Sequence, residues 1–220
     1  MTLKPLDDYT NHNEAKIVID NAHKFSKERA QNKEVSFEQE FSDTIDMRIT
    51  NAKASMNEES YSLKTSRRQN LDEYISGYAN EELQNTLRSN VEESIKLDNL
   101  FTSKKNNLIM SIDDANGTSF AENPELKQIF DQAANLQKSL EEVKNNNTFS
   151  PFIRKAHSEG KNDALDYTSA VIGELDNFAK NTALYCELKA FKEEKPTTAL
   201  AEGQEHTINP LTEKSNSLSL

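Results

Sequence analysis

The stretch LKQIFDQAANLQKSLEEV, residues 126–143, decides the fold class because its apolar residues recur every three or four positions. That spacing is the period of an α-helix, and it places the apolar side chains in one stripe along the helix. A free-standing coiled coil sustains three or four heptads, whereas this stripe spans fewer than three. We therefore expect it to pack inside the chain's own helical bundle, with self-association through part of the bundle as the alternative. The stripe consists of Leu126, Ile129, Ala133, Leu136, Leu140 and Val143.

Start and stop signals around this stretch divide the chain into about six helices. Asn123-Pro124 opens the helix of residues 126–143, since Asn caps a helix and Pro suits its first position. A five-residue step in the apolar stripe after Tyr78, next to Gly77, predicts a kink or break within a longer helix. Similar caps and stripes predict the other helices, at residues 11–31, 37–66, 71–115, 150–160 and 163–194.

The composition agrees with an all-α fold. The chain of 220 residues has five Gly and five Pro, which argues against a turn-rich all-β fold. We predict an elongated antiparallel helical bundle, coiled-coil-like in its packing, over residues 1–194, with a possible subdivision near residues 116–123. Residues 195–220 are polar and lack a sustained period, so we expect them to form a flexible, disordered tail.

Charge and apolar patterning restrict the partners. The net charge of −11 disfavours nucleic acid and anionic membrane surfaces. The pair Lys104-Lys105 is interpreted as part of a solvated helix face. No apolar run reaches the length of a membrane span or a signal peptide, so we expect a cytoplasmic protein. In the first helix, the pattern predicts one apolar face made of Ala15, Val18, Ile19, Ala22 and Phe25.

Candidate catalytic and metal-binding residues are few. Asp20 and His23 are one helical turn apart, but a di-iron bundle needs a second such pair, which the sequence lacks. Cys186, the single cysteine, has no histidine near it in sequence and is interpreted as a buried small apolar residue, with His157 as a guessed partner. The glycines are scattered singly, so no phosphate-binding loop is predicted. We expect no enzyme, no cofactor and no metal.

These features predict a non-enzymatic protein that binds or scaffolds other proteins through its helical surfaces. The stripe pattern is compatible with a monomer or a homo-oligomer.

The tail suggests an alternative function. Its sequence ends in SNSLSL, residues 215–220, after a series of acidic residues, and it is similar to the C-terminal translocation signals of effectors exported by the type IVB (Dot/Icm-type) system of intracellular bacteria. The resemblance is one of composition and covers about 28 residues. It implies a secreted bacterial effector that is translocated into a host cell and binds a host protein. The acidic residues are Glu193, Glu194, Glu202, Glu205 and Glu213.

Overall fold

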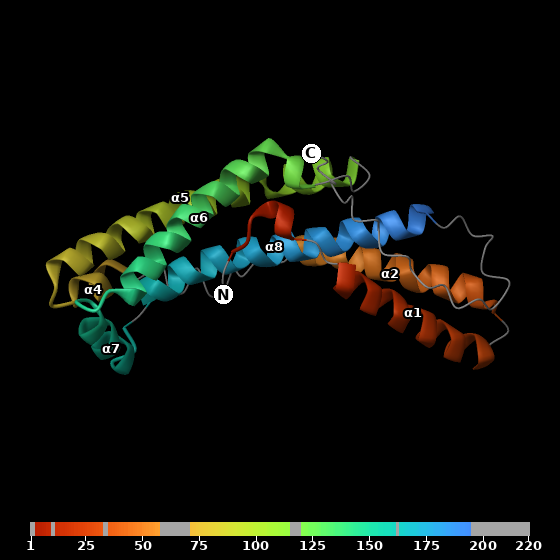
Figure 1. The fold of residues 1–220 in the computed structure, drawn as a ribbon, viewed down its shortest axis with the longest axis horizontal. Helices are drawn as coiled ribbons and strands as arrows, with labels where there is room; N and C mark the ends of the chain where they lie inside the picture. Colours follow the sequence, from red (N-terminus) through yellow and green to blue (C-terminus); the bar gives the residue numbers. More distant parts are fainter. Residues whose placement is uncertain are drawn as a thin grey trace, which may run out of the picture.

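A computed structural model of the chain describes residues 3–9, 12–32, 35–57, 71–114, 120–161 and 163–194. Within these ranges the secondary structure is helical, with no strand, and the helices form an elongated, arched bundle (Figure 1). The predicted all-α fold class is therefore confirmed. The helices are α1 (His12–Asn32), α2 (Phe37–Asn57), α4 (Leu71–Ser76), α5 (Glu81–Asp114), α6 (Pro124–Asn145), α7 (Ser150–Ser158) and α8 (Asp163–Glu194), with 3₁₀ turns η1 (Leu6–Asp8) and η2 (Phe120–Glu122).

The helix boundaries follow the caps that the sequence carries. The side chain of Asn123 accepts hydrogen bonds from the backbone N–H groups of Glu125 at 3.0 Å and Leu126 at 3.1 Å, so α6 begins at the predicted Pro124. The predicted break also occurs, because α4 ends at Ser76 and the Asn80 side chain starts α5 by accepting from the N–H of Leu83 at 2.8 Å.

The described residues therefore contain seven α-helices where six were predicted, since the segment from 71 to 115 forms two. The part of the predicted second helix beyond Asn57 lies outside the described residues, as does the predicted tail at 195–220. Near the predicted subdivision, η2 buries Phe120 and Ala121 in the main hydrophobic core.

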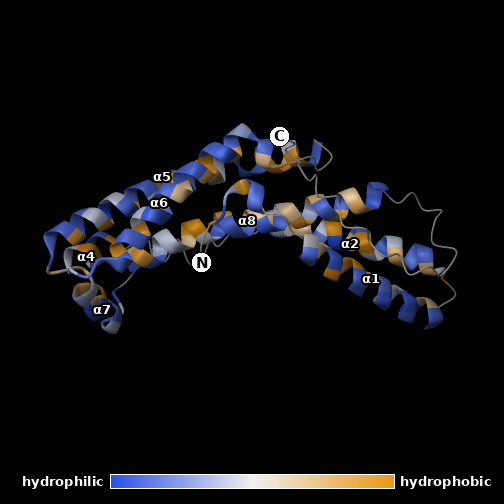
Figure 2. Ribbon diagram, in the orientation of Figure 1, coloured by the Kyte–Doolittle hydropathy of each residue, from blue (hydrophilic) through white to orange (hydrophobic). Residues whose placement is uncertain are grey.

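Helix α8 is the shared element of the fold. It packs against α5 and α6 in one half of the arch and against α1 and α2 in the other (Figure 1). Such a helix needs apolar residues on several sides, and Figure 2 shows hydrophobic residues recurring along α8 from one half to the other. None of the helices in the described ranges is long and apolar enough to cross a lipid bilayer.

The hydrophobic interior has two parts of unequal size. The main core runs through α4, α5, α6 and the facing side of α8, and it includes Met56 of α2. A smaller cluster joins α1 to α2 and is built on Ala22, Phe41 and Ile45, with Phe191 of α8 packed against it. The two halves of the arch therefore differ in how much apolar surface they bury.

Candidate functional site

The α6 stripe predicted from the sequence is buried in the chain itself. Its six residues are at most 5% exposed and belong to the main core. The helices in contact with α6 are mainly α5 and α8. The stripe is thus covered by the chain's own helices, and its burial contributes to the stability of the fold.

Helix α1 has the opposite arrangement of apolar side chains. Its fully covered positions are small residues, Ala15, Ala22 and Ser26, and the Ser26 hydroxyl donates to the Thr44 hydroxyl of α2 at 3.2 Å. Of its larger apolar side chains, Ile19 packs against the cluster that joins α1 to α2. Ile17 and Phe25 face solvent instead, with exposures of 59% and 46%.

The predicted face of α1 was therefore wrong at Phe25. The buried positions of α1 continue from Ala22 to Ser26, four residues later. Phe25, three residues after Ala22, therefore lies beside this buried stripe and not on it. The Phe25 ring is covered in part by the Arg29 guanidinium, 5.3 Å from the ring centroid.

A segment before α1, residues 3–9, lies against α6 and α8. We call this segment the strap. Its Tyr9 hydroxyl donates to Oδ1 of Asp176 on α8 at 2.8 Å, and its Leu3 N–H donates to Oε1 of Gln137 on α6 at 2.6 Å. The pKa of Tyr9 is raised far above its usual range, chiefly because the side chain is buried. No helix or contact was predicted for residues 3–9.

An ion pair lies inside the bundle between α5 and α8. Nζ of Lys105 is 3.6 Å from Oε1 of Glu174, and the two side chains are 6% and 7% exposed. The ammonium group of Lys105 also lies 5.6 Å from the centroid of the Phe101 ring. The interpretation of Lys104-Lys105 as a solvated pair was therefore wrong for Lys105, which continues the apolar stripe of α5 four residues after Phe101.

A second polar cluster joins α2, α5 and α8 at the end of α5. Nζ of Lys53 lies 2.5 Å from Oδ2 of Asp113, the Tyr185 hydroxyl donates to Oδ1, and Nζ of Lys189 lies 3.2 Å from Oδ1. The hydrogen bond from Lys53, followed by that from Tyr185, holds the pKa of Asp113 far below its usual range. Burial, reinforced by Asp113, raises the pKa of Tyr185.

Asp113 should make folding stability depend on pH. A carboxyl whose pKa is lower in the folded chain stabilises it above the unfolded pKa of about 4, and this contribution is lost as the pH falls. Because the Asp113 side chain is 37% exposed, solvent screening reduces the contribution to about 1 kcal/mol. Asp113→Asn should lower the urea midpoint at pH 7, and its difference from the wild type should shrink at pH 3. Asp114→Asn, at the exposed neighbouring position, should match the wild type; an equal loss in both variants would contradict the assignment.

Cys186 lacks the surroundings of a nucleophile. Its side chain is buried, and this burial raises the pKa of the thiol to about 11. The guessed partner His157 lies on α7, whereas Cys186 lies 23 residues beyond the start of α8 at Asp163, about 35 Å further along a helix that rises 1.5 Å per residue. The structure does not bring the two together.

We expect Cys186 to react slowly with a disulfide reagent such as 5,5′-dithiobis(2-nitrobenzoate). At pH 8 the reaction of the folded chain should be at least about tenfold slower than that of the chain unfolded in urea, because only the thiolate reacts. Since this is the one cysteine of the sequence, the absorbance change reports it directly. Equal rates in the folded and unfolded chains would show that the thiol is accessible.

The Asp20–His23 pair has no metal-binding surroundings. The imidazole of His23 packs edge-on against the rings of Phe37 and Phe41, with centroid distances of 4.9 and 5.8 Å. Across the described ranges, no three His, Cys, Asp or Glu side chains gather in a way that could hold a metal ion.

A hollow lies where the turn between α4 and α5 faces α7. Tyr74, Tyr78 and Phe152 line it, together with charged side chains from the end of α7. Glu159 pairs there with Lys161 at 3.0 Å and with Lys155 at 4.0 Å. The Glu159 carboxylate thus lies between two lysines at this hollow.

In comparisons with known proteins, no family model, no curated protein and no solved structure matches the chain.

Proposed function

We propose that this protein is a non-enzymatic helical interaction protein and that the outward face of α1 contributes to partner binding. The observation that carries the proposal is the arrangement of α1, which packs on its own chain through Ala15, Ala22 and Ser26 while exposing Ile17 and Phe25. A helix with large apolar side chains on its outward side is suited to pack against a helix or a groove of another protein.

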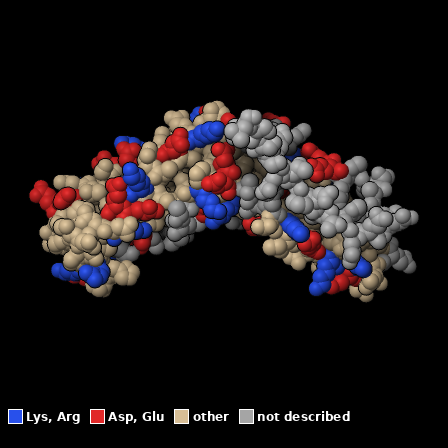
Figure 3. All heavy atoms as spheres, in the orientation of Figure 1, with Lys and Arg blue, Asp and Glu red and all other residues tan. Residues whose placement is uncertain are grey.

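The rest of the described structure supports this function. Some of the buried polar groups of α5 and α8 pair across the two helices, as in the Lys105–Glu174 ion pair and in the hydrogen bond from Ser94 to Thr168 at 3.0 Å. These contacts hold the two helices together. On the face shown in Figure 3, acidic and basic side chains are interspersed, which favours a protein partner over a polyanion.

Substitutions on α1 test the proposal. The full-length chain and the variant Ile17→Asn/Phe25→Asn should be compared in proximity labelling and in capture from the source cells. We expect the α1 variant to lose its specific partners by about tenfold or more, since central apolar anchors dominate such interfaces. Met110→Asn is the matched control, because Met110 is 63% exposed but lies on α5. Identical partner sets for all three chains would contradict a role of α1.

The secreted-effector alternative is a separate proposal that rests on residues 195–220. A chain without these residues should lose translocation into host cells while keeping the helix content of the full chain, and unchanged translocation would contradict it.

A further inference from the structure

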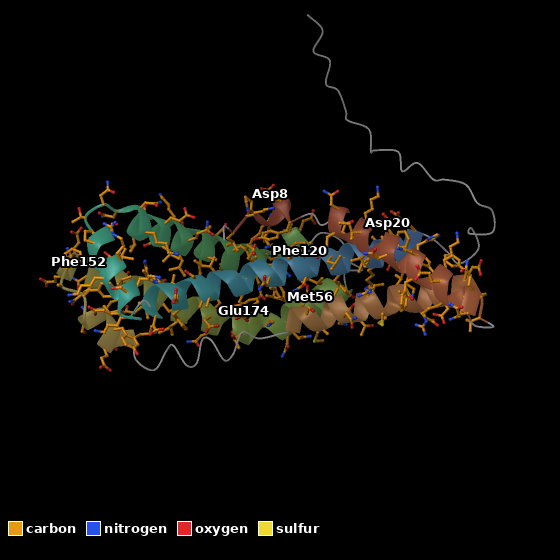
Figure 4. All side chains as sticks on the ribbon, turned by 90° about the horizontal axis from the view of Figure 1, so that it is seen from below. Asp8, Asp20, Met56, Phe120, Phe152 and Glu174 are labelled. Carbon is orange, nitrogen blue, oxygen red and sulfur yellow. The ribbon has the colours of Figure 1, made fainter. Side chains whose placement is uncertain are left out.

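The strap places every third side chain against the bundle. Leu3, Leu6 and Tyr9 are buried, with exposures of 8%, 6% and 5%. The four residues between them are exposed, and Figure 4 shows Asp8 at the edge of the molecule beside α8. Extended polyproline-like backbone, such as that of Pro5, and the 3₁₀ turn η1 both have three residues per turn, so the buried side chains share one side.

The surface beneath the strap combines apolar and polar groups. We call it the strap seat and define it by Phe130 and Gln137 on α6 and Asp176 on α8. The Tyr9 ring meets the Phe130 ring edge-on at a centroid distance of 5.8 Å, while its hydroxyl reaches Asp176. The backbone N–H of Leu3 bonds to Gln137, which sets the position of the other end of the strap.

Asp176 gives the seat its specificity. Its carboxylate is 1% exposed in the middle of α8, and a buried carboxylate is costly unless donors surround it. Lys180 supplies one donor, with Nζ 2.6 Å from Oδ2, and the Tyr9 hydroxyl supplies another at Oδ1. A phenylalanine in place of Tyr9 would fill the same space without this donor, so the seat distinguishes tyrosine from phenylalanine.

Leu3, Leu6 and Tyr9 belong to the main hydrophobic core, and the strap joins it mainly through these side chains, as a docked peptide would. Its backbone hydrogen bonds from Asp8 to Pro5 and from Tyr9 to Leu6 are internal, and the N–H of Lys4 bonds to the Tyr9 hydroxyl at 3.1 Å. Short segments held by a few side chains open at lower free energy than the helices beneath them.

We propose that residues 3–9 are a displaceable strap, and that the strap seat binds a partner segment of the same chemistry, with two apolar side chains and a tyrosine at every third position. This inference rests on the proposed interaction function and names one binding surface for it. The strap then competes with the partner segment for the strap seat. Because the strap belongs to the same chain as the seat, its effective concentration is high.

The test uses the full-length chain and a fluorescent peptide of residues 2–10, followed by fluorescence anisotropy. A strap-weakened chain, Leu6→Ala/Tyr9→Ala, should bind this peptide at least about tenfold more tightly than the wild type, whose own strap competes. A peptide with Tyr9→Phe should bind about tenfold more weakly, because it lacks the donor to Asp176. Equal binding by both chains, or none by a strap-weakened chain with the circular dichroism of the wild type, would overturn the proposal.

Hydrogen exchange of the wild-type chain keeps the proposal testable if the strap-weakened chain does not fold. The amides of Leu3 and Lys4 should exchange at least about tenfold faster than that of Leu136 in α6, because the strap opens alone. Exchange at the same rate as the α6 amide would show that the strap is part of the core. Neither measurement involves a foreign protein, so failure here leaves the test of the α1 face untouched.

Discussion

Replacing Lys105 by methionine is expected to lower the free energy of unfolding by about 3–5 kcal/mol, because the variant removes the cation that pairs with the buried Glu174 carboxylate. Both side chains are less than 10% exposed, so water cannot take over the role of the lysine without opening the bundle. Urea unfolding followed by circular dichroism measures the loss.

Two further variants make the result specific. Lys104→Met changes the neighbouring lysine, whose ion pair with Glu125 is 39% and 50% exposed, and it should cost less than about 1 kcal/mol. The double variant Lys105→Met/Glu174→Leu removes both charges and should recover most of the stability, because apolar residues can replace a buried ion pair. Equal losses from Lys104→Met and Lys105→Met would contradict the burial of this pair.

The second large effect is expected at the α6 stripe. Leu140→Ala should lower the free energy of unfolding by about 2–5 kcal/mol, through lost apolar burial and the cavity that remains. Leu140 is 4% exposed and belongs to the main core, so the core side chains around it lose direct contacts. For a chain of this length each kcal/mol lowers the melting temperature by about 2–4 °C, which differential scanning calorimetry resolves.

The mass of the Leu140→Ala variant separates stability from assembly. Light scattering after size exclusion should give the same mass as the wild type, since the stripe is covered by the chain's own helices. Lys138→Ala is the control on the same helix, because its side chain is 79% exposed, and it should change stability by less than about 0.5 kcal/mol. A lower mass with an unchanged melting temperature would identify the stripe as an interface between copies.

The sequence predicted the helices well because their signals are local. The Asn123 cap and the Asn80 cap each act on N–H groups two or three residues away, so sequence spacing is enough to locate a helix start. The break after Ser76 is similar, since the step in the stripe and Gly77 lie side by side in the chain.

The polar contacts between different helices could not be predicted, because they join residues far apart in sequence. Tyr9 and Asp176 are 167 positions apart, and spacing says nothing about which distant helices touch. Lys105 is different, because a signal was present: it lies between Phe101 and Leu108 on the stripe of α5. A lysine at an apolar position of a stripe indicates a buried partner, and this position outweighs the charge of the side chain.

The two hydrophobic clusters have a consequence for cooperativity. The outer end of the α1–α2 hairpin is held to the C-terminal part of α8 by a small cluster of three buried apolar residues, whereas the end of α2 that carries Ala52 and Met56 and the other half of the arch share the extended main core. The α1–α2 end should therefore unfold first. The half of the arch that contains α4, α5 and α6 should stay folded to a higher denaturant concentration. A ligand that binds α1 would raise the free energy of this partial unfolding. Ligand binding would therefore change the dynamics of the molecule most at its less stable end.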